Sequence, residues 1–137
     1  MITEYNPFLL DVEFNTVKKD QKLRQYLKKS KTCILVSWHD FKKTPDTKKL
    51  NLTLKEMKKI SNYVKIVTLA KSIDDSTKIL SLYNKPSKIK LIAFAMGEEA
   101  RFSRILCLHL GSPFTYVSLG KAVAPGQFSL NDMKSFQ

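Results

Sequence analysis

The sequence predicts an α/β domain in which a parallel β-sheet is covered by helices. Short apolar segments rich in β-branched residues alternate with longer amphipathic segments about five times, at intervals of roughly 25–30 residues. Two architectures fit this alternation: a doubly wound open sheet and a consecutive part of a (β/α)8 barrel. Periodicity alone favours the open sheet, because a whole barrel needs about 250 residues and the chain has 137. In either fold, reactive groups are expected at the carboxyl ends of the strands.

Each predicted element rests on composition and on its flanking residues. The strands are apolar runs, and the clearest is Thr32–Trp38, which is continuous enough to be buried on both faces. The predicted strands are Phe8–Phe14, Thr32–Trp38, Tyr63–Ala70, Lys90–Met96 and Pro113–Val117. The predicted helices are Thr16–Lys29, Thr44–Ser61, Ser72–Leu82, a helix between Gly97 and Gly111, and a last short helix from about Ser129, with a turn at Asn84–Ser87.

Composition predicts one globular domain spanning residues 1–137. Hydrophobic residues make up 43% and charged residues 26%, which is ordinary for such a domain. No apolar run approaches the roughly 18–20 residues of a membrane span, and the first residues lack a signal-peptide pattern. Cys33 and Cys107 lie far apart in apolar segments, which predicts reduced thiols and a cytoplasmic location.

A net charge of +12 leaves two interpretations open. The charge would suit nucleic acid or another anionic surface. However, the lysines are spread along the chain in pairs, and only Arg24, Arg101 and Arg104 supply the side chain that usually reads bases and phosphates. A solvated lysine surface is therefore favoured, and it would also attract anionic small molecules.

Lys65 is the most unusual residue of the predicted sheet, because it interrupts an apolar strand. An ammonium is costly to bury unless it is paired or loses its proton. Lys65 is therefore either an edge-strand lysine that reaches water or an amine used in chemistry.

Other polar residues are expected near the same edge of the sheet, among them Asp11, Glu13 and His39. His39 suits a structural role and an acid–base role equally well. Asp40 is a poor partner for it, since neighbouring side chains in a strand point to opposite faces. Cys107 and His109 are weak metal candidates, because a spacing of two diverges on a helix.

Four segments together resemble the ordered signature of type I 3-dehydroquinate dehydratase. The segments are Ser37–Pro45, Val64–Val67, Met96-Gly97 with Ser103-Arg104, and Ala124–Gln127, and the resemblance runs from Asp11 to the last helix. It favours the barrel, of which this chain would be the C-terminal portion, strands four to eight. It implies a lyase of the shikimate pathway of aromatic amino acid biosynthesis, which converts 3-dehydroquinate to 3-dehydroshikimate and water without a metal or cofactor.

The resemblance also implies roles for individual residues. Lys65 matches the lysine that forms a Schiff base with the substrate ketone, and burial beside cations such as Arg104 is expected to lower its pKa. His39 matches the proton-transfer residue. Arg104 and Gln127 match residues that hold the substrate carboxylate and hydroxyls, and Met96 and Tyr116 fall where they would line the pocket.

The sequence departs from the family pattern in three respects. Val123 stands where a serine is frequent, and Ala100 stands where a glycine is common. The first three β/α units of the family, with the glutamate that orients the histidine, have no counterpart, so weak or no turnover is expected from this chain alone. A homodimer or a complementing N-terminal half are the partners considered. Two alternatives stay open: a non-catalytic basic module that binds anions or nucleic acid, and an imine-forming barrel with another substrate.

Overall fold

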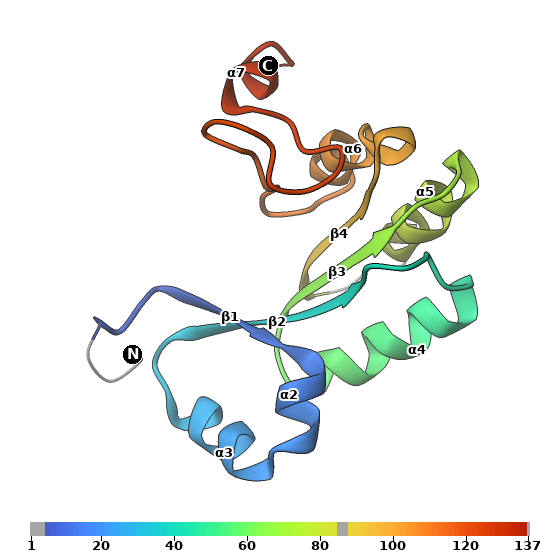
Figure 1. Cartoon of the computed structure of the whole chain (residues 1–137). Coiled ribbons are helices and arrows are strands. Elements are labelled where there is room, and N and C mark those ends of the chain that lie inside the picture. Colours follow the sequence, from blue (N-terminus) through green and yellow to red (C-terminus); the bar gives the residue numbers. More distant parts are fainter. Residues whose placement is uncertain (1–4, 85–87, 137) are drawn as a thin grey trace.

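The structure, a computed structural model, describes residues 5–84 and 88–136 and is organised around a parallel sheet. In the described part of the chain, four strands follow one another in the order β1-β2-β3-β4 (Figure 1). The strands are β1 (Leu9–Glu13), β2 (Cys33–Asp40), β3 (Tyr63–Leu69) and β4 (Lys90–Met96). The predicted α/β fold with parallel strands is confirmed.

The helices connect the strands, and side-chain caps define where most of them begin. The described helices are α2 (Phe14–Lys19), α3 (Gln21–Lys29), α4 (Thr47–Lys58), α5 (Ile73–Leu80), α6 (Ser103–His109) and α7 (Leu130–Lys134), with 3-10 turns η1 (Ser81–Asn84) and η2 (Glu98–Ala100). One helix was predicted over 16–29, but Asp20 adopts an extended backbone there and its carboxylate caps the next helix at Leu23 N. Asp46, Ser72 and Ser129 cap α4, α5 and α7 in the same way.

The helix-covered face of the sheet holds the larger part of the core. Even-numbered residues of β2 and β3 and odd-numbered residues of β4 point to this face, following the two-residue period of a strand. They pack against α4 and α5, and against Phe14 at the start of α2. The fully buried members include Val36, Val64, Ile66, Ala93, Leu50, Met57 and Ile79.

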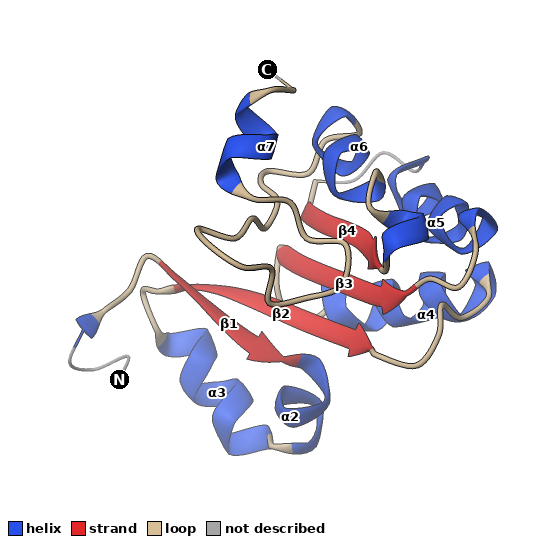
Figure 2. Ribbon diagram, turned by 45° about the horizontal axis from the view of Figure 1, so that its top comes forward, coloured by secondary structure: helices blue, strands red, loops and turns tan. Residues whose placement is uncertain are grey.

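The predicted fifth strand, Pro113–Val117, is not formed. This segment runs across the opposite face of the sheet, where Phe114 and Tyr116 pack against Phe94 and other apolar residues (Figure 2). Pro113 has no N–H to donate to a ladder, and packing of the aromatic rings on the face takes the segment away from the edge of β4. Just after this segment, Ser118 forms an isolated bridge with Ser129. The described chain therefore has four parallel strands instead of about five.

Two glycines bring the C-terminal loop against the end of β4. Gly97 N donates to Pro125 O at 3.2 Å, and Gly126 has a φ of +70°. A Cβ atom on Gly126 would lie 2.4 Å from Gly97 O, so only glycine allows this approach. The loop is thus held at the carboxyl edge of the sheet. Of the predicted turn 84–87, residues 85–87 lie outside the described part of the chain.

None of the described helices combines the length and the apolar character that crossing a membrane requires.

Candidate functional site

The face of the sheet opposite to α4 and α5, here called the inner face, carries the polar residues selected from the sequence. Asp11 and Glu13 from β1, His39 from β2 and Lys65 from β3 alternate with residues that point to the helices. The register places Glu13, Ser37 and Lys65 in one row across three strands. His39 lies two residues after Ser37 in β2, on the same face. Three neighbouring strands thus present four ionisable side chains to one surface.

Lys65 is held within this face by a carboxylate and a phenol. Its side chain is 10% exposed, and Nζ lies 2.7 Å from Asp11 Oδ2. Tyr116 covers it: the hydroxyl is 3.5 Å from Nζ and the ring centroid 4.6 Å. Burial of Tyr116 raises the pKa of its phenol, which keeps the hydroxyl protonated at neutral pH. Lys65 is the third of seven residues in β3, so it lies within the sheet and not at the end of its strand.

His39 finds its carboxylate partner within this chain. Its Nδ1 lies 3.0 Å from Glu13 Oε2, and its ring stacks on Phe41. Asp40 was predicted to be a poor partner for His39, and it instead accepts hydrogen bonds from the backbone N–H groups of Lys42 and Lys43. The expectation that the histidine would lack an orienting glutamate is therefore wrong for this structure, since Glu13 holds one ring nitrogen and leaves Nε2 for other contacts.

Arg104 is a buried cation with few partners. It is 2% exposed, its guanidinium carbon lies 4.5 Å from the Phe94 ring centroid, and one nitrogen donates to Pro125 O at 3.3 Å. Among residues 5–84 and 88–136 it has no carboxylate partner, and its buried Nε has no hydrogen-bond acceptor. Burial lowers the pKa of the guanidinium. A buried arginine without an anionic partner in the described part of the chain suits an anionic ligand.

Aromatic rings connect Arg104 with Lys65 across the inner face. Phe94 lies under Arg104, the Phe94 and Tyr116 rings are 6.2 Å apart, and Tyr116 lies over Lys65. Met96, next on this face of β4, is buried in the same cluster. Lys65, Arg104, Met96 and Tyr116 are therefore brought together around one apolar surface.

Gln127 does not point into this cluster. Its Oε1 accepts a hydrogen bond from Val123 N at 2.9 Å, so the side chain closes its own loop. Val123, which stands where the family frequently has serine, is 87% exposed. Ala100, which stands where a glycine is common, is fully buried beside the sheet. The sequence analysis gave no role to Asp11, which contacts Lys65. Because side chains alternate between the two faces of a strand, Asp11 and Glu13 share a face of β1, and this pattern could have placed Asp11 near Lys65.

Comparison with known proteins identifies the family. A family model described as type I 3-dehydroquinase matches residues 1–136. The chain belongs to this family. A curated 3-dehydroquinate dehydratase of Methanococcus maripaludis strain C6 is 41% identical over 132 residues, which are 94% of this chain and 60% of that protein. A second one, of Dehalococcoides mccartyi strain BAV1, is 41% identical over 92% of this chain and 57% of that protein. This type I 3-dehydroquinase chain thus spans less than two thirds of the curated relatives it matches.

Solved structures of the family agree with the fold. The 3-dehydroquinate dehydratase of Aquifex aeolicus superposes with a TM-score of 0.78 at 29% identity, over 93% of this chain and 58% of that one. The enzyme of Geobacillus kaustophilus superposes with a TM-score of 0.83 at 24% identity, over 93% of this chain and 51% of that one. The open sheet of this type I 3-dehydroquinase chain therefore corresponds to part of a larger TIM-barrel-like fold.

The cysteine and histidine of α6 do not form a metal site. Cys107 is fully buried and donates to Arg104 O, whereas His109 is exposed. Within the described residues, no cluster of three or more histidine, cysteine or acidic side chains could hold a metal ion. Cys33 and Cys107 are free thiols, as predicted.

Proposed function

We propose that this chain carries the imine-forming part of a 3-dehydroquinate dehydratase. In the proposed reaction, Lys65 Nζ condenses with the ketone of 3-dehydroquinate and releases water. The resulting iminium withdraws electrons from the adjacent C–H bond, whose proton then leaves more readily. Loss of the neighbouring hydroxyl as a second water gives the conjugated product, and hydrolysis of the imine returns the amine of Lys65.

The contacts of Lys65 support its assignment as the nucleophile. The amine must be neutral to attack, and Asp11 Oδ2 holds Nζ in place by an ion pair at 2.7 Å that has to separate before the neutral amine reaches the ketone. Tyr116 excludes water from one side of the amine. We assign Asp11 and Tyr116 as positioning residues, because both touch Nζ in the absence of substrate.

His39 is proposed as the group that moves the C–H proton. Its Nδ1 is engaged by Glu13, which fixes the ring and directs Nε2 outward as the acid–base atom. His39 lies two residues after Ser37, the residue of β2 that pairs with Lys65. This position suits a group that acts on a carbon next to the imine.

Arg104 is the single observation that most supports an anionic substrate. An arginine that is 2% exposed and has no carboxylate partner among the described residues is costly unless a ligand pairs with it. The substrate carboxylate would provide that pair through a charge-assisted fork. Met96 would line the apolar wall, and Gln127 would have to exchange its bond with Val123 N for a substrate hydroxyl.

We propose that turnover belongs to the assembled barrel. The relatives are longer than this chain, and the described β1 and β4 strands each have one neighbour in the sheet. The remaining β/α units, as an N-terminal half, would pair with these edges and close the ring. The free thiols are consistent with a reaction in the cytoplasm.

The test is a dehydratase assay of the assembled barrel. The chain is co-expressed with those β/α units of the Methanococcus maripaludis relative that lie beyond the matched region, and formation of the conjugated product is followed by ultraviolet absorbance. Turnover is expected with the control variant Lys71→Ala, whose lysine is exposed, and no turnover is expected with Lys65→Ala. Equal turnover in the two variants would refute the assignment.

A further inference from the structure

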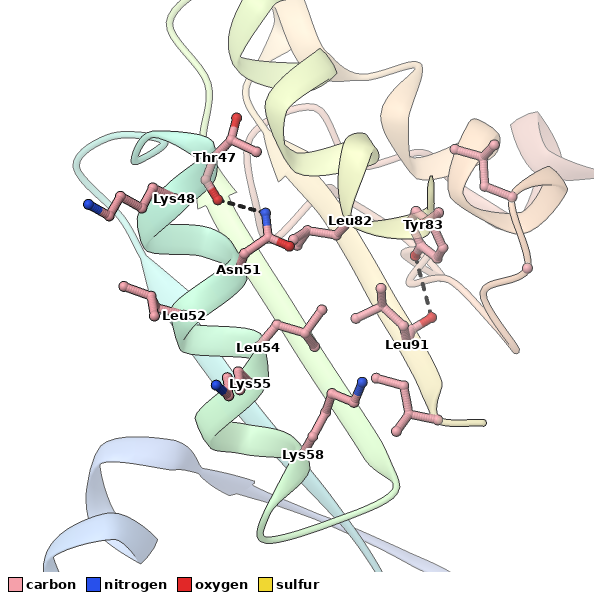
Figure 3. Close-up of a pocket in the computed structure, with 13 residues that line it drawn as sticks. Thr47, Lys48, Asn51, Leu52, Leu54, Lys55, Lys58, Leu82, Tyr83 and Leu91 are labelled. Atoms are coloured by element: carbon pink, nitrogen blue, oxygen red, sulfur yellow. Dashed lines mark hydrogen bonds between the residues drawn. The ribbon is translucent and has the colours of Figure 1, made fainter. Parts of the chain in front are cut away.

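A second surface, distant from the inner face, lies between α4 and the start of β4. A groove of about 770 Å³ opens here, and we call it the α4 groove (Figure 3). Its described lining consists of Thr47, Lys48, Asn51, Leu52, Leu54, Lys55, Lys58, Leu82, Tyr83, Ile89, Leu91, Leu110 and Gly111. Seven of these residues belong to α4, and they extend from Thr47 to Lys58, so the groove follows this helix over its whole length.

The groove lies beside the shorter of two neighbouring helices. Helix α5 has eight residues and is followed by the 3-10 turn η1, whereas α4 has twelve. The C-terminal half of α4 therefore has η1 and the first residues of β4 as neighbours on that side, where Leu54 and Leu82 form part of an apolar floor (Figure 3).

The floor and the rim of the groove differ in chemistry. The floor is apolar, with Leu54, Leu82 and Leu91 at its centre. Lys48, Lys55 and Lys58 stand along α4, and in Figure 3 the Lys58 amine extends from the helix toward β4. None of the thirteen lining residues is acidic. Leu52 and Leu110 line the groove with 52% and 46% of their surface exposed, so it is open to solvent.

We propose that the α4 groove is a docking site for an acidic amphipathic helix of a partner protein. An apolar floor bordered by a helix of about three turns matches the recognition mode in which a partner helix inserts leucine-like anchors at positions i, i+3 and i+7. The lysines and the net charge of +12 select acidic residues at the flanks of that helix. A small anionic molecule fits less well, since such ligands bury most of their surface in a closed pocket.

The test compares two synthetic helical peptides with the full 137-residue chain by fluorescence anisotropy. The peptides share one leucine stripe and differ in their polar positions, which are glutamate in one and lysine in the other. The acidic peptide is expected to bind at least about tenfold more tightly. Lys55→Glu/Lys58→Glu is expected to abolish or reverse that preference.

A matched control separates the groove from the overall positive field. Lys28→Glu/Lys29→Glu changes net charge by the same amount, and both pairs occupy the last turn of a helix, so their effects on the helix dipole are alike. The control is expected to retain most of the preference, and thermal unfolding by circular dichroism verifies that both variants fold. Three results would overturn the proposal: no binding of the acidic peptide, equal binding of the two peptides, or equal loss in the two double variants. Binding of laurate in the groove without binding of either peptide would assign the groove to a small amphiphile and would overturn the proposal as well.

Discussion

The two faces of the sheet are built from the same strands and differ in the side chains they hold. On the helix-covered face, Val64 and Ile66 are fully buried in an apolar core. On the inner face, their neighbour Lys65 lies between a carboxylate and a phenol under a loop without regular structure. The comparison shows that residues one position apart can belong to an apolar core and to a polar cluster, because a strand alternates its side chains between faces.

The comparison predicts its largest effect for the helix-covered face. Ile66→Ala removes methyl groups from a fully buried site, so the free energy of unfolding is expected to fall by about 2–5 kcal/mol. Urea unfolding followed by circular dichroism measures it. A loss below about 1 kcal/mol would mean that this face is not the main core.

The next effect is expected where the C-terminal loop touches β4. Gly126→Ala places a Cβ against Gly97 O at a positive φ, which should cost about 1–3 kcal/mol. Gly120→Ala is the control, since nothing lies within 4 Å of its added Cβ. Limited proteolysis of the loop should accelerate in the first variant alone, and similar rates in both would remove the proposed anchor.

A smaller effect with a defined pH dependence is expected at α5. The hydrogen bond from Lys78 and that from Lys71 N lower the pKa of Asp75. A depressed carboxyl pKa adds stability above the unfolded value, and this stability is lost as the pH falls through the folded pKa. Asp75→Asn should therefore cost about 1 kcal/mol at pH 7 and almost nothing near pH 2, when compared with Asp74→Asn. A cost independent of pH would contradict this account.

The smallest change in stability is expected on the inner face. Lys65→Met removes the amine but leaves Asp11, whose side chain is 40% exposed and can be hydrated. The free energy of unfolding should change by about 0.5 kcal/mol or less. Comparison with Ile66→Ala by the same urea titration sharpens the contrast between faces. A loss of unfolding free energy as large as that of Ile66→Ala would mean that Lys65 mainly stabilises the fold.

The sequence predicted the parallel strands and the unusual lysine because both are local patterns. It did not predict that Tyr116 would leave the sheet and cover Lys65, since the choice between an edge and a face depends on which partner is present. The contacts of Asp11 and Glu13 were also missed, because each spans a strand register that no local pattern determines.

Arg104 illustrates the same limit. Its place on a helix was predicted, but its burial over Phe94 follows from packing of α6 against β4. Helix α6 begins at Ser103, after the 3-10 turn η2, and lies within the predicted range between Gly97 and Gly111.

Reductive trapping tests the central assignment most directly. The chain, co-expressed with the N-terminal half used in the dehydratase assay, is incubated with 3-dehydroquinate and borohydride, and the labelled peptide is located by mass spectrometry. The account predicts one stable adduct on Lys65, absent from Lys65→Met and retained in Lys71→Ala. An adduct on another lysine, or equal labelling of the Lys65→Met variant, would contradict it.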